Sequence, residues 1–185
     1  MPLVNSIDQI IEESKKPLPG DVERIVARDV GSSLHYYRFL HALAKEVKPD
    51  LMVELGTWKG TSAACLADGN PAGRVVTIEL FPRVLEEEVK RLNIEHLIMD
   101  SMDDSFDLRN VDILFIDTEH DGLRPRAEYD FWLPRMSKNN IILLDDINLN
   151  DEMRAFWAEL ATPGEKIELP IHGEAGFGLI LNQGY

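Results

Sequence analysis

The sequence predicts an α/β fold of the doubly wound class, with a mostly parallel seven-stranded sheet that ends in an antiparallel C-terminal hairpin edge. Five short apolar runs predict the parallel strands, because each is nearly continuous and does not alternate with polar residues, as is typical of strands covered on both faces. Helical segments lie between the runs, so right-handed crossovers are expected. The runs span residues 51–55, 74–80, 95–99, 111–117 and 140–145.

A polar arm over residues 1–31 precedes the predicted domain, which spans residues 32–185. Pro17, Pro19 and Gly20 interrupt the arm. We therefore expect an appendage to the domain. Two roles are open for it: closing over a site, or exchange with a neighbouring subunit in a homo-oligomer.

The first helix of the domain is expected to begin at Ser32 or Ser33, either of which suits the N-cap position, and to run to about Val47. Pro49 ends it, because the residue before a proline disfavours helical geometry. Further helices are expected over residues 61–67, 82–92 and 124–136, with a shorter one over 101–108.

The pattern changes after Asp146. Asn150 is predicted to cap a helix that runs through Leu160 and stops before Pro163. Two β-rich runs follow, over residues 166–171 and 176–182, around a short connection. They account for the antiparallel edge of the sheet.

Composition excludes several classes of protein. The 185 residues carry 19 Lys and Arg against 33 Asp and Glu, a formal net charge of −14, which disfavours binding to nucleic acid and to anionic membranes. Cys65 is the single cysteine, so neither an intramolecular disulfide nor a thiolate zinc site is available. No basic n-region with an apolar core stands at the N-terminus, and we expect a single-domain cytoplasmic protein.

A glycine-bearing turn follows the first predicted strand. Glu54 ends the strand, and Gly56 and Gly60 allow backbone amides to approach a ligand closely. The helix that begins near Ser62 adds its N-terminal N–H groups, which makes a cradle of the kind that binds nucleotides. The spacing matches neither a dinucleotide fingerprint nor a P-loop.

Acidic residues also end the next two strands. Glu79 is placed to accept both hydroxyls of a ribose. Asp100, followed by Ser101, is placed to take an adenine amino group. Each residue alone is equally consistent with a solvated carboxylate, but carboxylates at successive strand ends favour a nucleotide-type cofactor.

With these motifs the chain, from about Leu34 to its end, resembles the class I S-adenosylmethionine-dependent methyltransferases. The segment from Glu54 to Gly60 looks like the motif I of that superfamily, and the C-terminal hairpin is similar to its antiparallel last strand. The resemblance implies a Rossmann-like sheet that binds S-adenosylmethionine. The residues implied to hold this cofactor are Glu54, Gly56, Thr57, Gly60, Ser62, Glu79, Asp100, Ser101 and Asp117.

A second acidic group is predicted where the fourth and fifth strands end. Asp117 follows the fourth strand, and Asp145 and Asp146 follow the fifth, so the three carboxylates should converge. They repel one another unless they are protonated or bridged by a cation, and oxygen ligands suit Mg²⁺ or Mn²⁺. The alternative is that Asp145 and Asp146 cap the next helix, a role that Asn150 already fills.

This group narrows the resemblance to metal-dependent small-molecule O-methyltransferases, of the catechol type and of the macrocin O-methyltransferase and cephalosporin hydroxylase-like group. It implies that Asp117, Asp145 and Asp146 hold a divalent metal that chelates a substrate hydroxyl. Thr118 and Glu119 depart from the Gly and Asp usual in that group. His120 is a candidate for the catalytic base, beside Asp117, with a hydrogen-bonded loop histidine as the equal alternative.

The sequence thus predicts methyl transfer from S-adenosylmethionine to a hydroxyl of a small molecule, with help from a divalent metal. Two alternatives stay open. An NAD-binding oxidoreductase would share the sheet and the ribose acid but needs a tighter glycine fingerprint. A non-catalytic protein that binds a nucleotide cofactor would use the cradle and leave the second acidic group without a ligand.

Overall fold

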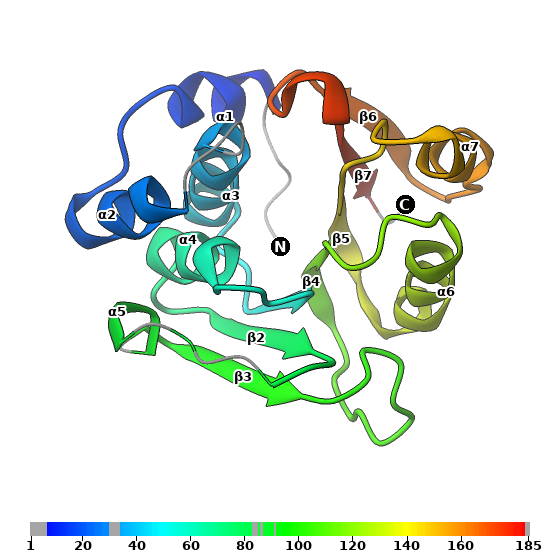
Figure 1. The fold of residues 1–185 in the computed structure, drawn as a ribbon, viewed down its shortest axis with the longest axis horizontal. Helices are drawn as coiled ribbons and strands as arrows, with labels where there is room; N and C mark the ends of the chain where they lie inside the picture. The colour runs from blue at the N-terminus through cyan, green and yellow to red at the C-terminus, as the bar shows by residue number, and fades with distance from the viewer. Residues whose placement is uncertain (1–6, 30–33, 83–84, 86, 91, 184–185) are drawn as a thin grey trace.

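The computed structural model describes residues 7–29, 34–82, 85, 87–90 and 92–183. The described strands form one seven-stranded sheet in the order β3-β2-β1-β4-β5-β7-β6, with β7 antiparallel to both its neighbours and the other pairs parallel (Figure 1). The strands are β1 (Leu51–Leu55), β2 (Arg74–Glu79), β3 (Ile94–Ile98), β4 (Val111–Ile116), β5 (Met136–Asp145), β6 (Glu165–Leu169) and β7 (Phe177–Asn182). The predicted fold class and hairpin edge are confirmed.

Two layers of helices cover the sheet (Figure 1). The α-helices are α1 (Ile7–Ser14), α2 (Gly20–Arg28), α3 (Leu34–Val47), α4 (Thr61–Gly69), α5 (Glu87–Lys90), α6 (Leu123–Trp132) and α7 (Asp151–Glu159), and the 3₁₀ turns are η1 (Leu133–Arg135) and η2 (Gly173–Ala175). Alternate residues of each central strand pack on opposite layers, because side chains of a strand point alternately to its two faces. In β4, Phe115 packs with α3 and Leu114 packs with α6 and α7. None of the described helices is long and apolar enough to cross a membrane.

Parallel pairing brings the carboxyl ends of the central strands to one edge of the sheet. Leu55, the last residue of β1, lies in register with Ile78 of β2 and Ile116 of β4. The β4–β5 register places Leu144 beside the same Ile116. The residues that follow these strands therefore start from neighbouring positions.

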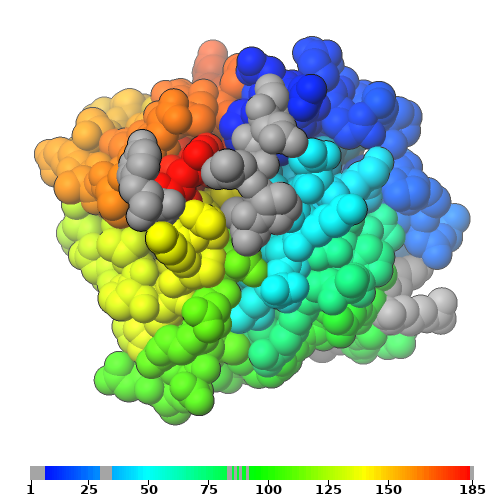
Figure 2. All heavy atoms as spheres, turned by 180° about the vertical axis from the view of Figure 1, so that it is seen from behind, coloured from blue at the N-terminus to red at the C-terminus, as the bar shows by residue number. Residues whose placement is uncertain are grey.

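The arm shares the core of the domain. Ile10, Val22 and Val26 are buried and belong to the same apolar cluster as the sheet residues Phe115 and Phe177. In Figures 1 and 2 the N-terminal helix, in blue, lies beside the C-terminal segment, in orange and red. The described part of the arm is thus a packed layer and not the appendage that its composition suggested.

Several predicted helix and strand boundaries differ from those in the structure. The helix expected over 101–108 is wrong: these residues form turns, because the side chains of Asp100 and Asp103 accept hydrogen bonds from the N–H groups two residues later. The helix expected over 124–136 ends in η1, and β5 starts at Met136, four residues before the prediction. Ser32 and Ser33 and part of 82–92 lie outside the described residues.

Asn150 caps α7 as predicted, since its side-chain oxygen accepts a hydrogen bond of 2.8 Å from the N–H of Met153. Its amide also donates to the carbonyl oxygen of His120 at 2.7 Å, which ties the β4–α6 loop to the start of α7.

Replacing Asn150 by alanine should lower the free energy of unfolding by about 1 kcal/mol, the usual loss for an N-cap. Asn150→Asp keeps the cap but loses the donor to His120, so its loss should be smaller than that of alanine. Urea unfolding of the three proteins measures both effects. Equal stability of wild type and Asn150→Ala would contradict this account of the cap.

Candidate functional site

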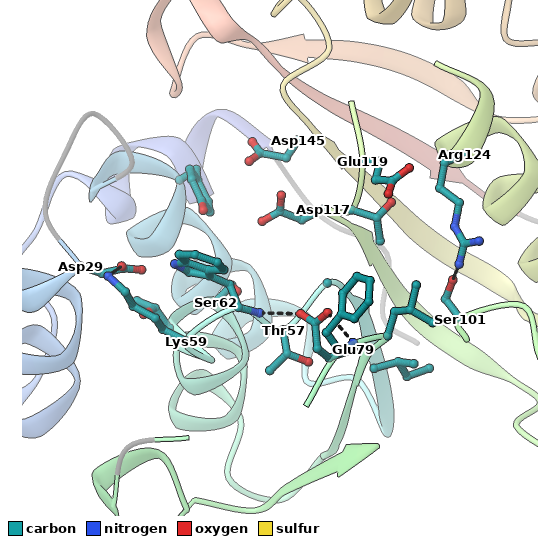
Figure 3. A pocket seen from close by; sticks show the side chains of 18 of the residues that line it. Asp29, Thr57, Lys59, Ser62, Glu79, Ser101, Asp117, Glu119, Arg124 and Asp145 are labelled. Atoms are coloured by element: carbon teal, nitrogen blue, oxygen red, sulfur yellow. Dashed lines mark hydrogen bonds and ion pairs between the residues drawn. The ribbon is translucent and has the colours of Figure 1, made fainter. Parts of the chain in front are cut away.

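A cavity of about 430 Å³ opens where β1, β2, β4 and β5 end (Figure 3). Twelve of its lining residues belong to the ends of these strands or to the loops that follow them, and the others come from the arm, from α3, from α4, from the loop after β3 and from α6. The lining residues are Asp29, Tyr36, Tyr37, Gly56, Thr57, Trp58, Lys59, Thr61, Ser62, Ile78, Glu79, Leu80, Phe81, Ser101, Asp117, Thr118, Glu119, Arg124 and Asp145.

The glycine turn passes directly against the end of β4. Gly56 has a φ of +92°, and a Cβ added to it would lie 1.8 Å from the carbonyl oxygen of Asp117. Gly60, at φ +79°, is the N-cap of α4 and has no side chain to cap that helix. The turn thus needs glycine at both positions, at Gly56 for space and at Gly60 for the left-handed backbone.

Glu79 is held in a fixed orientation at the floor of the cavity. Its two carboxylate oxygens accept hydrogen bonds of 3.2 Å from the N–H groups of Trp58 and Phe81 (Figure 3). The side chains of Trp58 and Phe81 stay largely exposed at the cavity mouth. Each carboxylate oxygen of Glu79 keeps a second acceptor position, as the predicted contact with two ribose hydroxyls requires.

Glu54 lies beneath the turn and does not line the cavity. It is fully buried, and the hydroxyl of Thr77 donates to its carboxylate. Burial raises the pKa of Glu54 to about 8, against the opposing effect of hydrogen bonds from Ser62 and Thr77. This position does not agree with the predicted direct contact between Glu54 and a ligand. Glu54 instead supports the glycine turn from below.

Ser101 lines the far side of the cavity, and Asp100 does not. The hydroxyl of Ser101 donates to the buried carboxylate of Glu128 and accepts from Arg124 at 2.7 Å. Asp100 pairs with the same arginine at 2.8 Å, outside the lining. Its pKa is lowered by the N–H of Met102 and by Arg124. Of the two residues predicted here, only Ser101 faces the cavity.

Asp117, Asp145 and Asp146 converge as predicted. Asp117 and Asp145 line the cavity, with their carboxylates near each other in Figure 3. Asp146 does not line it but has a possible ligand atom within 4.8 Å of those of Asp145 and His172. Burial, followed by repulsion from Asp146, raises the pKa of Asp117 to about 7. Burial, followed by repulsion from Asp117, raises the pKa of Asp145 well above its usual range. A bound cation would favour the ionised forms of Asp117 and Asp145 against this repulsion.

Two histidines flank these carboxylates. His120 Nε2 lies 3.4 Å from an oxygen of Asp146 and 3.8 Å from an oxygen of Asp117. His172 Nε2 lies 3.1 Å from Asp146 and 3.6 Å from Asp145. Possible ligand atoms of Asp117, His120 and Asp145, and likewise of Asp145, Asp146 and His172, lie within 4.8 Å of one another.

The group fits a divalent cation. Within the described part of the chain, Asp145 Oδ1 and His120 Nε2 are buried without a hydrogen-bond partner, an arrangement that is costly unless something else satisfies these atoms. Carboxylate oxygens with imidazole nitrogen suit Mn²⁺ and related ions as well as Mg²⁺.

Sequence reasoning missed several residues of the site. His172 had no predicted partner, because it lies in the connection between β6 and β7, remote in sequence from the acids it contacts. Asp29 and Tyr37 reach the cavity from the arm and from α3. Arg124 was assigned only to a helix. None of these positions belongs to a local motif, and only the packing of distant elements reveals them.

This chain matches one protein family and is similar to one curated protein. A family model described as "Methyltransferase domain" matches residues 53–147. The relative, the uncharacterized protein y4gI of Sinorhizobium fredii (strain NBRC 101917 / NGR234), is 24% identical over 166 residues, which cover 75% of this chain and 18% of that protein. The chain therefore spans less than a fifth of the length of this relative.

Solved structures of similar fold include two O-methyltransferases. The Bacillus cereus O-methyltransferase in complex with SAH is 21% identical, with a TM-score of 0.68 over 98% of this chain and 94% of that chain. TomG from Streptomyces achromogenes, involved in tomaymycin synthesis and solved with SAM, is 21% identical, with a TM-score of 0.65 over 98% and 93% of the two chains. At this level of identity the similarity shows a common fold.

Because Gly56 lies so close to the backbone of Asp117, adding one methyl group at Gly56 should lower the free energy of unfolding strongly. Gly173→Ala is the matched control, because Gly173 also has a positive φ but has open space around it. The control should cost about 1–2 kcal/mol for the left-handed backbone. Gly56→Ala should cost that amount plus about 1–3 kcal/mol for the displaced end of β4. Thermal or urea unfolding compares them, and equal losses would contradict the close approach.

Proposed function

The chain belongs to the methyltransferase domain family, and from this premise we propose that it transfers the methyl group of S-adenosylmethionine to a hydroxyl of a small molecule. The observation that supports this proposal best is the arrangement of one cavity, in which a nucleoside cradle and a buried acidic group face each other. The cradle offers positions for the donor, and the acidic group offers a position for the acceptor. Family membership disfavours the hydride-transfer alternative.

The cradle supports S-adenosylmethionine as the donor. Glu79, fixed by two backbone N–H groups, would accept from the ribose hydroxyls, and Ser101, on the opposite side of the cavity from the glycine turn, would lie near the adenine. Gly56 and Thr57 supply a close backbone wall for the rest of the molecule. The donor supplies a methyl group that is already electrophilic, so the chain has to align an oxygen nucleophile with it.

The acidic group supports a divalent cation beside the acceptor. Asp117, Asp145 and Asp146 would hold the ion, which would orient a substrate hydroxyl and lower its pKa. With the ion held by the three carboxylates and not by His120, the His120 Nε2 atom, next to Asp117 and Asp146, is available to take the proton of the acceptor hydroxyl, the role that we assign to it. The net charge of −14 disfavours nucleic acids as acceptors.

Titration calorimetry of the purified, metal-stripped chain with S-adenosylmethionine tests the donor. We expect micromolar binding of the methyl donor and none of NAD. Addition of hydroxylated acceptors, such as catechols and sugars, should then release S-adenosylhomocysteine. Failure to bind the donor, with or without Mg²⁺ or Mn²⁺, would overturn the proposal, and binding without turnover would favour the non-catalytic alternative.

Binding of Mn²⁺, followed by electron paramagnetic resonance, tests the metal separately from activity. Wild type should bind the ion, and Asp145→Asn should weaken binding at least tenfold by removing a charged ligand. Asparagine resembles the protonated carboxyl that burial favours at this position, so the fold should persist. Asp151→Asn is the matched control, because Asp151 is an exposed acid at the start of α7. Equal Mn²⁺ affinity in Asp145→Asn and wild type would exclude this site.

A further inference from the structure

His172 is a buried imidazole that the connection between β6 and β7 brings against the acidic group. Its side chain is 6% exposed, and its Nε2 atom lies 3.1 Å from an oxygen of Asp146 and 3.6 Å from Asp145 Oδ1. Asp145 Oδ1 is buried without a hydrogen-bond partner among the described residues, an arrangement that is costly unless something else satisfies it. An ion held between these three side chains would supply the missing partner, since each offers a ligand atom within 4.8 Å of the others.

The backbone turns at Asp146 so that two adjacent acids face the same nitrogen. Successive side chains of a strand point to opposite faces, and Asp145 is the last residue of β5. Asp146 follows with a φ of +54°, in the left-handed region that residues other than glycine seldom adopt. The turn therefore brings oxygens of both carboxylates beside His172 Nε2.

Two sets of contacts hold His172 in this position. The N–H of Asn148, in the loop after β5, donates to the carbonyl oxygen of Ala175 at 2.7 Å, which joins that loop to the β6–β7 connection. The imidazole ring packs edge-on against the ring of Tyr36, with 4.9 Å between the centroids. Its Nδ1 atom is buried and has no hydrogen-bond partner within the described part of the chain. Ring packing therefore orients the imidazole with Nε2 toward the acids.

We propose that His172 supplies a nitrogen ligand, through Nε2, to the divalent cation of this site, and that it makes the site favour a transition ion over Mg²⁺. This inference rests on the proposed function and adds a fourth protein ligand to the three carboxylates. Membership of the methyltransferase domain family does not imply it, because the family model matches residues 53–147 and His172 lies beyond them.

Imidazole nitrogen distinguishes these ions because they differ in their preference for it. Mg²⁺ takes oxygen ligands, whereas imidazole suits Fe²⁺, Co²⁺ and Zn²⁺. Binding uses the lone pair of Nε2, so the proton of the neutral ring lies on Nδ1. His120 stays outside this ligand set and keeps its Nε2 atom for the proton of the acceptor.

A role as hydrogen-bond donor alone gives a different result. If the Nε2–H of His172 only donated to Asp146, loss of the ring would weaken every ion at the site by a similar factor. If Nε2 binds the ion, loss of the ring would weaken transition ions more than Mg²⁺, and bound Mn²⁺ would have a nitrogen atom in direct contact. Magnetic resonance and competition binding separate the two roles.

Pulsed electron paramagnetic resonance of bound Mn²⁺ tests the contact directly. The metal-stripped full chain, loaded with Mn²⁺, should show the nitrogen modulation of a coordinated imidazole. The signal should disappear in His172→Asn and persist in His120→Asn. A wild-type spectrum without the signal, an unchanged signal in His172→Asn or its complete loss in His120→Asn would overturn the proposal. Wild type and His120→Asn give this answer even if His172→Asn does not fold.

Competition of Co²⁺ and of Mg²⁺ with bound Mn²⁺ tests the selectivity. His172→Asn should lower the affinity for Co²⁺ at least about tenfold, the smallest loss usual even for partners of metal ligands. The affinity for Mg²⁺ should fall by less than about threefold, because Mg²⁺ prefers oxygen and asparagine offers one. His41→Asn is the matched control, because His41 is also buried with its Nε2 3.1 Å from an acid, Asp68, but does not line this cavity. It should keep both affinities.

The outcomes also separate this inference from the proposed function. If His172→Asn weakens Co²⁺ and Mg²⁺ by the same factor, His172 is not a ligand while the proposed function stands. If wild type binds none of the three ions, the metal part of the proposed function fails and this inference fails with it. Binding of S-adenosylmethionine in calorimetry then tests the rest of the proposed function independently.

Discussion

The close approach of Gly56 to the backbone of Asp117 is the constraint on which the site depends. β1 and β4 are neighbours in the sheet, and the Asp117 N–H donates to the carbonyl oxygen of Leu55 at 2.9 Å. With no side chain at Gly56, the glycine turn lies directly on the end of β4. The cradle that we propose for the donor and the acidic group thus share one wall. The proposed methyl transfer would need this proximity, because donor and acceptor must be aligned in line.

Burying carboxylates is the main free-energy cost of this arrangement, and a different interaction offsets that cost for each of them. Glu54 gains a raised pKa and a bond from Thr77. Glu128 is fully buried but accepts from Ser101, Thr118 and Arg124, so it links the loops after β3 and β4. Asp145 keeps an oxygen without a partner among the described residues. Hydrogen bonds balance Glu128. The raised pKa favours the neutral form of Glu54, whose Oε1 also has no partner among the described residues, and a cation suits Asp145.

Local sequence patterns predicted helices and strands well where one physical cause determined the local structure. The buried strands followed from continuous apolar runs, and the cap at Asn150 followed from its side chain at a helix start. The pattern failed over 101–108, where Asp100 and Asp103 bond to nearby N–H groups and replace helical hydrogen bonds. It also missed that the arm is part of the core, because a polar composition hides a few well-placed apolar residues such as Ile10 and Val22.

The sequence by itself determined the order of strands and helices, and so which acids stand at strand ends: Glu79, Asp117 and Asp145. Only the tertiary structure decided which other residues join them. Asp29 and His172 meet the site because the arm and the β6–β7 connection pack across the sheet from opposite ends of the chain. The periodicity of apolar residues indicates which residues share a face of one helix or strand. Contacts between distant elements depend on how whole layers pack, and no local pattern records them.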